Sequence, residues 1–418
     1  MAITQLKVQL QDSTIGQFTP NEGVAALVYG LEVSSGTLSG KPILFTSNDQ
    51  YTAWATAAQG DAGIVNNDAH LAAIIAKFYK KAGSGAYLWL MLVSGKNDDF
   101  VTSNAVAIKS MVYQTVANGF DYRPRLMGFV SQAVDTLAST PMPTTLPTMV
   151  TAIETMQNEL FAESFRVCNV VATSISTANL STSGALDPSK VVNFATYDAP
   201  SVAVLTTTSL GNPTVDAQGN ITAYVPLKDV GEVLGVMASI SIAQSIGSCG
   251  VPSVASQAFF NDQTNVVDIS TVSLAMFNGM GTAQNLFHRT RRQLTGVFYN
   301  DGATCNDATM ALSKLEYVRL GNAVCDDAEY YFQRIINTQQ PVDANGNLSA
   351  TAAALFENGF YNQFAQQRIS AGQCSNITVQ VDGTNFVSTK TLKVSISIQP
   401  SPSVEQVFVY TFYVTSQA

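Results

Sequence analysis

Residues 321–372 read GNAVCDDAEYYFQRIINTQQPVDANGNLSATAAALFENGFYNQFAQQRISAG and contain the clearest periodic pattern in the chain. In the first half, apolar side chains recur about every 3.6 residues, which predicts a helix of about four turns with one apolar face. That face consists of Val324, Ala328, Tyr331, Phe332, Ile335 and Ile336. The turn-rich residues 342–347 then end the helix.

A second helix is predicted after this turn. Ser349 is placed to cap its first turn, and Gly372 is placed to end it. Its apolar stripe is predicted to comprise Leu355, Phe356, Phe360 and Phe364. Gln363, Gln366, Gln367 and Arg368 lie largely off that stripe, so they are predicted to be the polar side.

The period changes to two after Gly372. Apolar residues alternate with polar ones in two runs, Ile377, Val379, Val381 and then Leu392, Val394, Ile396, Ile398. This alternation predicts a half-buried antiparallel pair of strands. The chain then breaks at Pro400-Ser401-Pro402, and residues 407–414 read VFVYTFYV, a strand with apolar or aromatic side chains on both faces.

The first two hundred residues alternate predicted strands and helices. Leu6, Val8 and Leu10 form a short terminal strand pattern with no obvious hairpin mate. Strands are predicted over residues 23–30, 42–46, 86–93, 129–130, 167–172 and 202–206. Asp68 begins a helix with Leu71, Ile74, Ile75 and Phe78 inward, and a second helix is predicted over residues 146–162. This order predicts an α/β (α+β mixed) fold with a covered sheet. Residues 194–226 contain several turns and are predicted to loop out on the surface.

Composition limits the possible functions. The chain has 418 residues, of which 46% are hydrophobic and 12% charged, with a formal net charge of -9. The acidic balance argues against a nucleic-acid coat, which needs a basic face to neutralise phosphates. The N-terminus shows no signal peptide, and the most apolar stretch, residues 233–246, is too short to insert in a bilayer. Five scattered cysteines, Cys168, Cys249, Cys305, Cys325 and Cys374, are typical of reduced structural thiols.

Several fragments look like chemical motifs but lack the required context. Gly83-Ser84-Gly85 precedes a strand and not a helix, so it is predicted to stop a helix and not to bind phosphate. Asp343, Asn345 and Asn347 have calcium-loop spacing, but Leu348 and Ala354 occupy the positions of the required Gly and Glu. A plain turn is therefore predicted there.

The two histidines offer little for acid–base chemistry. His70 lies in the first turn of a helix and is given a packing or surface role. His288 begins the one dense basic run, residues 288–292, which is interpreted as an ion-pair site between subunits. The sequence contains no Ser/His/Asp ordering, HExxH or paired-carboxylate motif, so we predict no catalytic site, no metal site and no cofactor.

The order of these segments resembles the contractile tail sheath family. The likeness is carried by residues 321–372, by LKVSISIQPSPSVEQVFVYTFYV, and upstream by RRQLTGVFYNDGATCND and DVGEVLGVMASISIAQSIGSCGVPS. Near the start it continues in GVAALVYG and YKKAGSGAYLWLMLVSG, so it covers most of the chain. The resemblance implies a structural subunit that polymerises as a helical lattice around an inner tube and contracts to drive that tube through a target envelope.

The resemblance also implies an arrangement of parts. We expect a tail-sheath-like core and a C-terminal unit of two helices plus an antiparallel sheet, with extended N- and C-terminal arms. The expected divisions are residues 1–20 (arm), 21–135 (α/β core), 136–285 (partly peripheral middle), 286–402 (C-terminal sheath domain) and 403–418 (arm strand). The core is expected to combine the N-terminal strands and helix with the C-terminal unit.

The resemblance further implies partners and contact residues. Expected partners are the chain itself, an inner tail tube protein, and baseplate and tail terminator proteins, with no nucleic acid and no direct membrane insertion. The arm strands between subunits are assigned to Leu6, Val8, Leu10, Val407, Val409, Phe412 and Val414. Arg334 on the first helix and Arg368 at the end of the second are the candidates for contact with the tube, and ordinary solvated arginines are the alternative.

Two other interpretations stay open at this stage. The location implied is a virion tail, assembled in the bacterial host cytoplasm, but the sheath of a headless injection device (a tailocin or a type VI-like system) has the same requirements. An α/β enzyme or binding module with no visible site is the alternative from another functional class. The absence of convergent polar motifs and the unpaired strand patterns at both ends favour the sheath.

Overall fold

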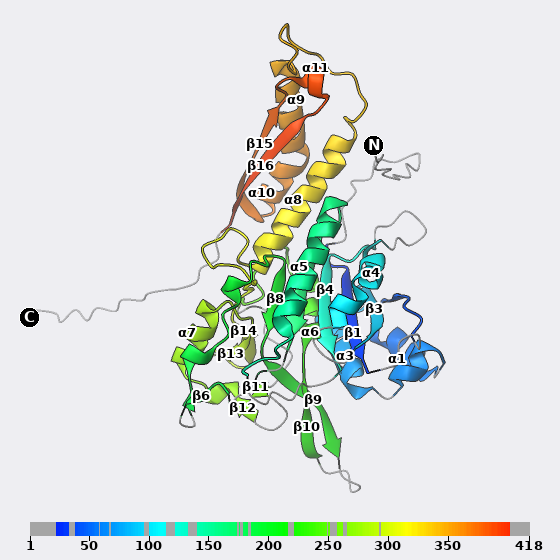
Figure 1. Cartoon of the computed structure of the whole chain (residues 1–418), viewed down its shortest axis with the longest axis vertical. Helices are drawn as coiled ribbons and strands as arrows, with labels where there is room; N and C mark the ends of the chain where they lie inside the picture. Colours follow the sequence, from blue (N-terminus) through cyan, green and yellow to red (C-terminus); the bar gives the residue numbers. More distant parts are fainter. Residues whose placement is uncertain are drawn as a thin grey trace, which may run out of the picture. The chain divides into compact units, whose positions relative to one another are not determined.

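The fold is seen in a computed structural model (Figure 1). The structure describes residues 22–32, 38–57, 59–66, 68–95, 100–113, 122–132, 140–173, 175, 179–182, 185–215, 221–248, 250, 257–261, 266–291 and 294–401. The chain divides into two compact units, Met1–Gln333 and Arg334–Ala418. The five divisions expected from the sequence stay a prediction.

Unit 1 is built on a six-stranded sheet with the order β2-β3-β1-β4-β5-β8. All neighbours are parallel except β2, which pairs antiparallel with β3 at one edge. The strands are β1 Ala25–Leu31, β2 Ile43–Phe45, β3 Leu88–Ser94, β4 Leu126–Ser131, β5 Cys168–Ala172 and β8 Val202–Leu205. Their near-continuous apolar runs fit strands buried on both faces, and the predicted covered sheet is confirmed.

Helices cover both faces of this sheet (Figure 1). On one face, alternate β1 side chains such as Leu27 pack with α3 (Ala69–Ala82) and α6 (Val230–Ser239). On the other, Val28 belongs to a buried cluster that also includes residues of α4 (Phe100–Val112), α5 (Leu146–Ala162) and α7 (Leu274–Thr282). The edge beyond β3 carries the short helices α1 (Asn48–Thr56) and α2 (Asp61–Val65).

The predicted helix boundaries in unit 1 are largely confirmed. The Asp68 carboxylate caps α3 by accepting from the amides of His70 and Leu71. All four predicted inward residues of α3 have no exposed surface, namely Leu71, Ile74, Ile75 and Phe78. Gly83, with a φ of 85°, ends α3, as left-handed backbone favours glycine. The prediction of residues 146–162 matches α5.

Helices α3 and α6 approach each other through two glycines. A Cβ on Gly231 would lie 2.1 Å from the carbonyl oxygen of Ile74, and a Cβ on Gly235 would lie 2.6 Å from that of Phe78. Only glycine allows the backbones to pass this closely. Gly231 and Gly235 therefore serve helix packing.

The middle of the chain is less peripheral than expected. It supplies β5 and β8 to the central sheet and α6 to its cover, so the core does not depend on the C-terminal helices for these layers. The expected surface loop over residues 194–226 is also wrong, because Phe194 is fully buried. That span contains β8 and most of a hairpin formed by β9 (Thr208–Val215) and β10 (Ile221–Leu227).

Smaller elements complete unit 1. The second sheet has the order β10-β9-β11-β12, and two further pairs are β6-β7 and β13-β14. Their bounds are β6 Ser181–Thr182, β7 Ala185–Leu186, β11 Ala258–Asn261, β12 Val266–Asp268, β13 His288–Thr290 and β14 Val297–Tyr299. Short 3-10 turns are η1 Pro188–Lys190, η2 Phe194–Thr196 and η3 Ile269–Thr271. The last helix of the unit, α8, spans Leu315–Gln333.

Helix α8 begins nine residues earlier than its predicted apolar face and ends before that face does. Val324 is buried as predicted, but Ile335 and Ile336 lie in the turn after the helix, and Ile336 is 66% exposed. The buried face comes mainly from the first half of the helix and includes Glu316 and Arg319. A pattern of apolar residues alone misses that half because its buried face contains charged residues.

Unit 2 contains a helix that packs on a hairpin. Helix α9 (Ala350–Phe360) continues through a single π-helical turn, η4 (Tyr361–Ala365), into α10 (Gln366–Ser370). Strands β15 (Cys374–Asp382) and β16 (Lys393–Pro400) flank the short helix α11 (Phe386–Thr389). The Ser349 cap and the Gly372 stop are confirmed. Phe356 and Phe360 are buried, but the prediction for Leu355 is wrong, because its side chain is 68% exposed.

Candidate functional site: an open-edged sheet in unit 2

The predicted antiparallel pair is confirmed in β15 and β16. Ile377 lies opposite Ile398, Val379 opposite Ile396 and Val381 opposite Val394. These six side chains form the apolar face, while the alternate residues are exposed. Strand β16 runs through Pro400, which pairs with Cys374, so the break comes after the first proline of the predicted interruption.

One face of this hairpin is covered by helices. Helices α9 and α10 both pack against β15. A carboxylate oxygen of Glu357 on α9 accepts from the amide of Val381 over 2.8 Å. That amide therefore points away from β16, and the amides of Val379 and Ile377 point to the same edge because amide directions alternate along a strand.

Both outer edges of the hairpin lack a third strand within the part of the chain that the structure describes. Exposed strand edges present unpaired amides and carbonyls, which are a template for another strand. A two-stranded sheet is marginal by itself, and added strands extend both its ladder and its apolar face. Another strand can therefore add to these edges through main-chain hydrogen bonds.

The arm residues assigned from the sequence lie outside the described residues. They are Leu6, Val8, Leu10, Val407, Val409, Phe412 and Val414. Their strand roles stay a prediction.

The two arginines assigned to tube contact both belong to unit 2. Arg334 does not lie on the first helix as expected, because α8 ends at Gln333 and Arg334 is in the turn that follows. Arg368 lies in α10, where its Nη1 donates to Gln373 Oε1 over 3.0 Å. Their role toward a tube stays a prediction.

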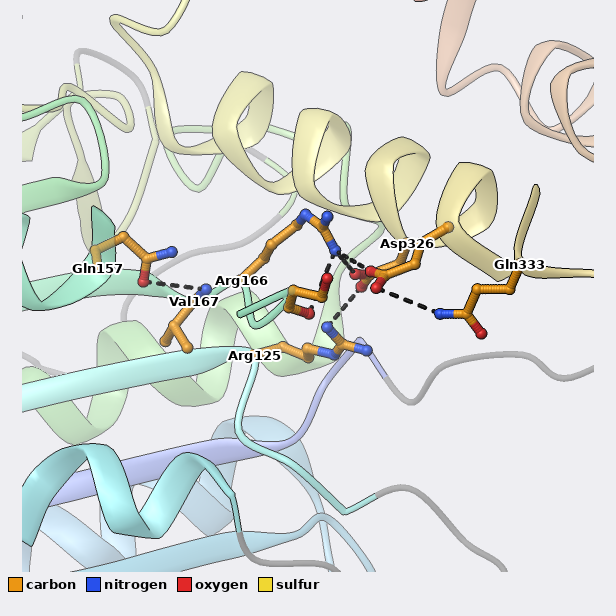
Figure 2. A network of polar contacts seen from close by, with 8 residues as sticks. Arg125, Gln157, Arg166, Val167, Asp326 and Gln333 are labelled. Atoms are coloured by element: carbon orange, nitrogen blue, oxygen red, sulfur yellow. Dashed lines mark hydrogen bonds and ion pairs between the residues drawn. The ribbon is translucent and has the colours of Figure 1, made fainter. Parts of the chain in front are cut away.

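A cluster of ion pairs holds α8 inside unit 1 (Figure 2). Arg125 precedes β4 and Arg166 precedes β5, so the amino ends of adjacent parallel strands bring the two guanidiniums together. Arg125 Nη1 lies 2.5 Å from Asp326 Oδ2, and Arg166 Nη1 lies 2.6 Å from Asp326 Oδ1. Arg166 also pairs with Glu329 at 3.0 Å, and Gln333 donates to the other oxygen of Glu329.

A second polar cluster lies inside unit 1. Lys77 Nζ lies 2.6 Å from Asp229 Oδ2, which also accepts from Ser209 Oγ at 2.7 Å. Burial opposes ionisation of Asp229, but Lys77 and the hydrogen bonds outweigh it and lower the pKa of Asp229. Asp229 and Ser209 have no exposed surface. Because Lys77 lies on α3, Asp229 at the start of α6 and Ser209 on β9, the cluster connects these three elements. Sequence reasoning missed it because its members are far apart in the chain.

Of the described residues in the basic run at 288–292, only the first is buried, and the interpretation of this run as an ion-pair site between subunits stays a prediction. His288 is fully buried, with its Nδ1 2.7 Å from Thr207 Oγ1, and burial lowers its pKa to about 4. Arg289 lies over the ring of Phe277, and Arg291 donates to the carbonyl of Gly247. Arg292 lies outside the described residues.

His70 and the turn at residues 342–347 both have local partners. His70 packs with its Nδ1 3.1 Å from the hydroxyl of Tyr29. Asp343 accepts from the amides of Asn345 and Asn347, which makes residues 342–347 a closed turn. Across the described ranges, no group of three or more His, Cys, Asp or Glu side chains is placed to hold a metal ion.

The other sequence expectations concern thiols and membranes. Four cysteines within the described chain are free thiols, Cys168, Cys305, Cys325 and Cys374. Cys249 lies outside it. Among the helices described, none combines the length and the hydropathy needed to cross a bilayer.

Comparison with known proteins supports one fold. No protein-family model and no curated protein sequence matches the chain. Among solved structures, the sheath of an extracellular contractile injection system, PVC, in its contracted state aligns over 98% of both chains with a TM-score of 0.57 and 12% identity. The contracted helical sheath of the anti-feeding prophage aligns over 99% of both chains with a TM-score of 0.57 and 11% identity.

A third solved structure extends the likeness to a further organism. The sheath tail protein from Desulfitobacterium hafniense aligns with 94% of this chain and 100% of its own, with a TM-score of 0.50 and 9% identity. Both units are therefore included in the likeness. The chain has the mixed α/β fold of contractile sheath proteins.

Proposed function

We propose that the chain is the structural subunit of a contractile tail sheath. It polymerises as a helical lattice around an inner tube, and the lattice contracts to drive the tube through a target cell envelope. The observation that carries this proposal is the sheath fold over almost the whole chain, including the open-edged hairpin of unit 2. A helical lattice needs a contact between different surfaces of identical subunits, and a donated strand provides one.

The proposed contact joins the arms of one subunit to the β15–β16 sheet of a neighbour. The alternation of Leu6, Val8 and Leu10 suits a strand with one buried face. The run at residues 407–414 is apolar on both faces and needs burial on both. Pro400, the last residue of β16, and Pro402 after it lack amide donors, which favours an extended link over a tight hairpin between β16 and this run.

Side-chain burial dominates the energy of this contact. Each main-chain hydrogen bond contributes about 0.5 to 1.5 kcal/mol net. Each large apolar side chain that becomes buried contributes about 1.5 to 3 kcal/mol. Burial of four or five such side chains from residues 407–414 would therefore contribute more free energy than the main-chain hydrogen bonds of the strand pair. Such a link tolerates rotation of the subunit bodies during contraction.

The proposed partners are further copies of the chain, an inner tube protein, and baseplate and tail terminator proteins. The proposed location is a virion tail assembled in the cytoplasm of a bacterial host. A headless contractile injection device is the second candidate, because two of the similar sheaths come from an extracellular injection system and the anti-feeding prophage.

A mechanical role is proposed in place of catalysis. The polar groups with the most enzyme-like spacing, Lys77, Ser209 and Asp229, pair with one another, and the latter two have no exposed surface. The alternative of an α/β enzyme therefore has no observation that favours it.

Negative-stain electron microscopy of the purified full-length chain tests this proposal. A sheath subunit should form long tubes of uniform width, and deletion of residues 1–12 should leave a folded monomer that does not polymerise. A full-length chain that stays monomeric under all assembly conditions would count against the proposal. Normal tubes from the deletion variant would refute the role of the N-terminal arm alone.

A further inference from the structure

A small cavity lies in unit 1 beside the ion-pair cluster of α8. Its volume is about 20 Å³, and its wall includes Glu22, Arg125, Arg166, Arg319, Asn322 and Asp326. A cavity needs about 10 to 15 Å³ to hold one water molecule, so this one has room for a single small guest. Three of its wall residues are arginines and two are carboxylates, and Glu329 beside the wall pairs with Arg166.

Arg319 is the arginine whose charge is least compensated. Its side chain is buried, with only 6% of the residue exposed. Nη2 donates to the carbonyls of Met237 at 2.7 Å and Ile240 at 3.4 Å. Within the described residues, neither Nη1 nor Nε of Arg319 has a hydrogen-bond acceptor. Buried donors without acceptors are costly in free energy, so we expect these two N–H groups to donate to a molecule or ion bound in the cavity.

The nearby carboxylates do not fill that need. Asp326 is shared by Arg125 and Arg166, and Glu329 pairs with Arg166. Glu22 also lies on the wall and offsets part of the Arg319 charge through space, but no hydrogen bond joins it to Nη1 or Nε. A water molecule could accept from Arg319, but it carries no charge to offset a guanidinium that has no ion pair within the described residues.

We propose that this cavity binds one small inorganic anion, with chloride as the representative ligand. The anion accepts from Nη1 and Nε of Arg319 and balances the charge of that guanidinium. Because Arg319 lies on α8 while Arg125 and Arg166 precede β4 and β5, a bound anion ties α8 to the amino ends of the sheet. This inference concerns unit 1 alone and does not depend on assembly.

Thermal unfolding of the full chain tests the site. Sodium chloride is raised from about 1 mM to about 100 mM while sodium gluconate keeps the ionic strength constant, and the melting temperature is measured. Above the Kd, each tenfold increase in chloride should raise Tm by roughly 2 °C. The Arg319→Met variant, which keeps the apolar stem, should lose this response.

Arg291→Met is the matched control. Arg291 also donates to a backbone carbonyl, that of Gly247 at 2.6 Å, but it does not line the cavity. This variant should keep the full chloride response. A wild-type Tm that is equal in chloride and gluconate would overturn the proposal, as would an undiminished response in Arg319→Met.

Bromide provides a measurement that needs no variant. Crystals of the full chain grown in sodium bromide should show an anomalous-scattering peak in the cavity beside Arg319. Ordered water at that position without anomalous signal would overturn the proposal, even if Arg319→Met fails to fold.

Discussion

Arg166 and Asp326 are 160 positions apart in the chain, yet Arg166 Nη1 donates to Asp326 Oδ1 over 2.6 Å. Asp326 also forms an ion pair with Arg125, so one carboxylate joins the amino ends of two parallel strands to α8. The three side chains are only 9 to 12% exposed, which limits screening by water. This carboxylate therefore fixes the position of the last helix of unit 1.

Asp326→Asn should destabilise unit 1 strongly. The change leaves two partly buried guanidiniums facing a neutral group, and breaking a buried pair costs about 3 to 5 kcal/mol. Glu159→Gln is the control, because Glu159 pairs with Lys109 but is 54% exposed, and an exposed pair contributes about 0 to 1 kcal/mol. Urea unfolding of both variants measures the difference. Equal losses would show that Asp326 has no special role.

Gly231→Ala and Gly321→Ala should have opposite effects on stability. A Cβ on Gly231 would lie 2.1 Å from the Ile74 carbonyl, so α3 and α6 would have to separate, at a cost of about 1 to 3 kcal/mol or more. Gly321 in α8 has no atom within 4 Å of such a Cβ, so alanine should add about 1 kcal/mol through helix propensity. Thermal unfolding of the two variants checks the signs, and a neutral Gly231→Ala would contradict the close helix contact.

Acid should weaken unit 1 before most carboxylates titrate. Burial lowers the pKa of His288 to about 4, whereas an unfolded histidine titrates near about 6.5. The unfolded chain therefore binds the proton first as the pH falls. The contribution is fully present above about pH 6.5 and is lost toward about pH 4, with a full size of roughly 3 kcal/mol.

The variant His288→Gln isolates this contribution. The chain has two histidines, and burial lowers the pKa of His70 to about 4 as well. The slope of unfolding free energy between about pH 5 and 7 should therefore fall by about half in the variant. Urea unfolding at several pH values gives that slope. An unchanged slope would mean that His288 is not the buried neutral group described above.

The sequence predicts the strands of the central sheet and helices α3 and α5 because their signals are local. The Asp68 cap, the inward stripe of α3 and the Gly83 stop lie within one short segment, and the structure confirms all three. The strand pair in unit 2 is equally local, because alternation in two neighbouring runs predicts an antiparallel pair, and in that pair Ile377 lies opposite Ile398.

The rest depends on contacts between distant segments. Asp229 pairs with Lys77 across 152 positions, and no periodicity records such a pair. Leu355 fits a helical stripe with Phe356 and Phe360, but the hairpin covers only part of that stripe and leaves Leu355 exposed. The first half of α8 is missed because its buried Glu316 and Arg319 interrupt the apolar pattern that predicts an inward face.

Charge reversal should separate tube binding from self-assembly. If Arg334 and Arg368 contact an acidic inner tube, the double variant Arg334→Glu/Arg368→Glu should assemble on the tube at least tenfold less while still forming sheath alone, since two like-charge contacts cost about 1.4 kcal/mol or more together. Co-sedimentation with the tube protein and tube counts in its absence provide the two readouts. Equal loss of both activities would count against the assignment.

A cryo-EM reconstruction of tubes formed by the full-length chain tests the central claim most directly. The measurement is the position of residues 407–414 in the lattice. We predict that they add a strand to an open edge of the β15–β16 sheet in a neighbouring subunit, with main-chain hydrogen bonds along that edge. The same residues completing the sheet of their own subunit, with no strand crossing between subunits, would contradict it.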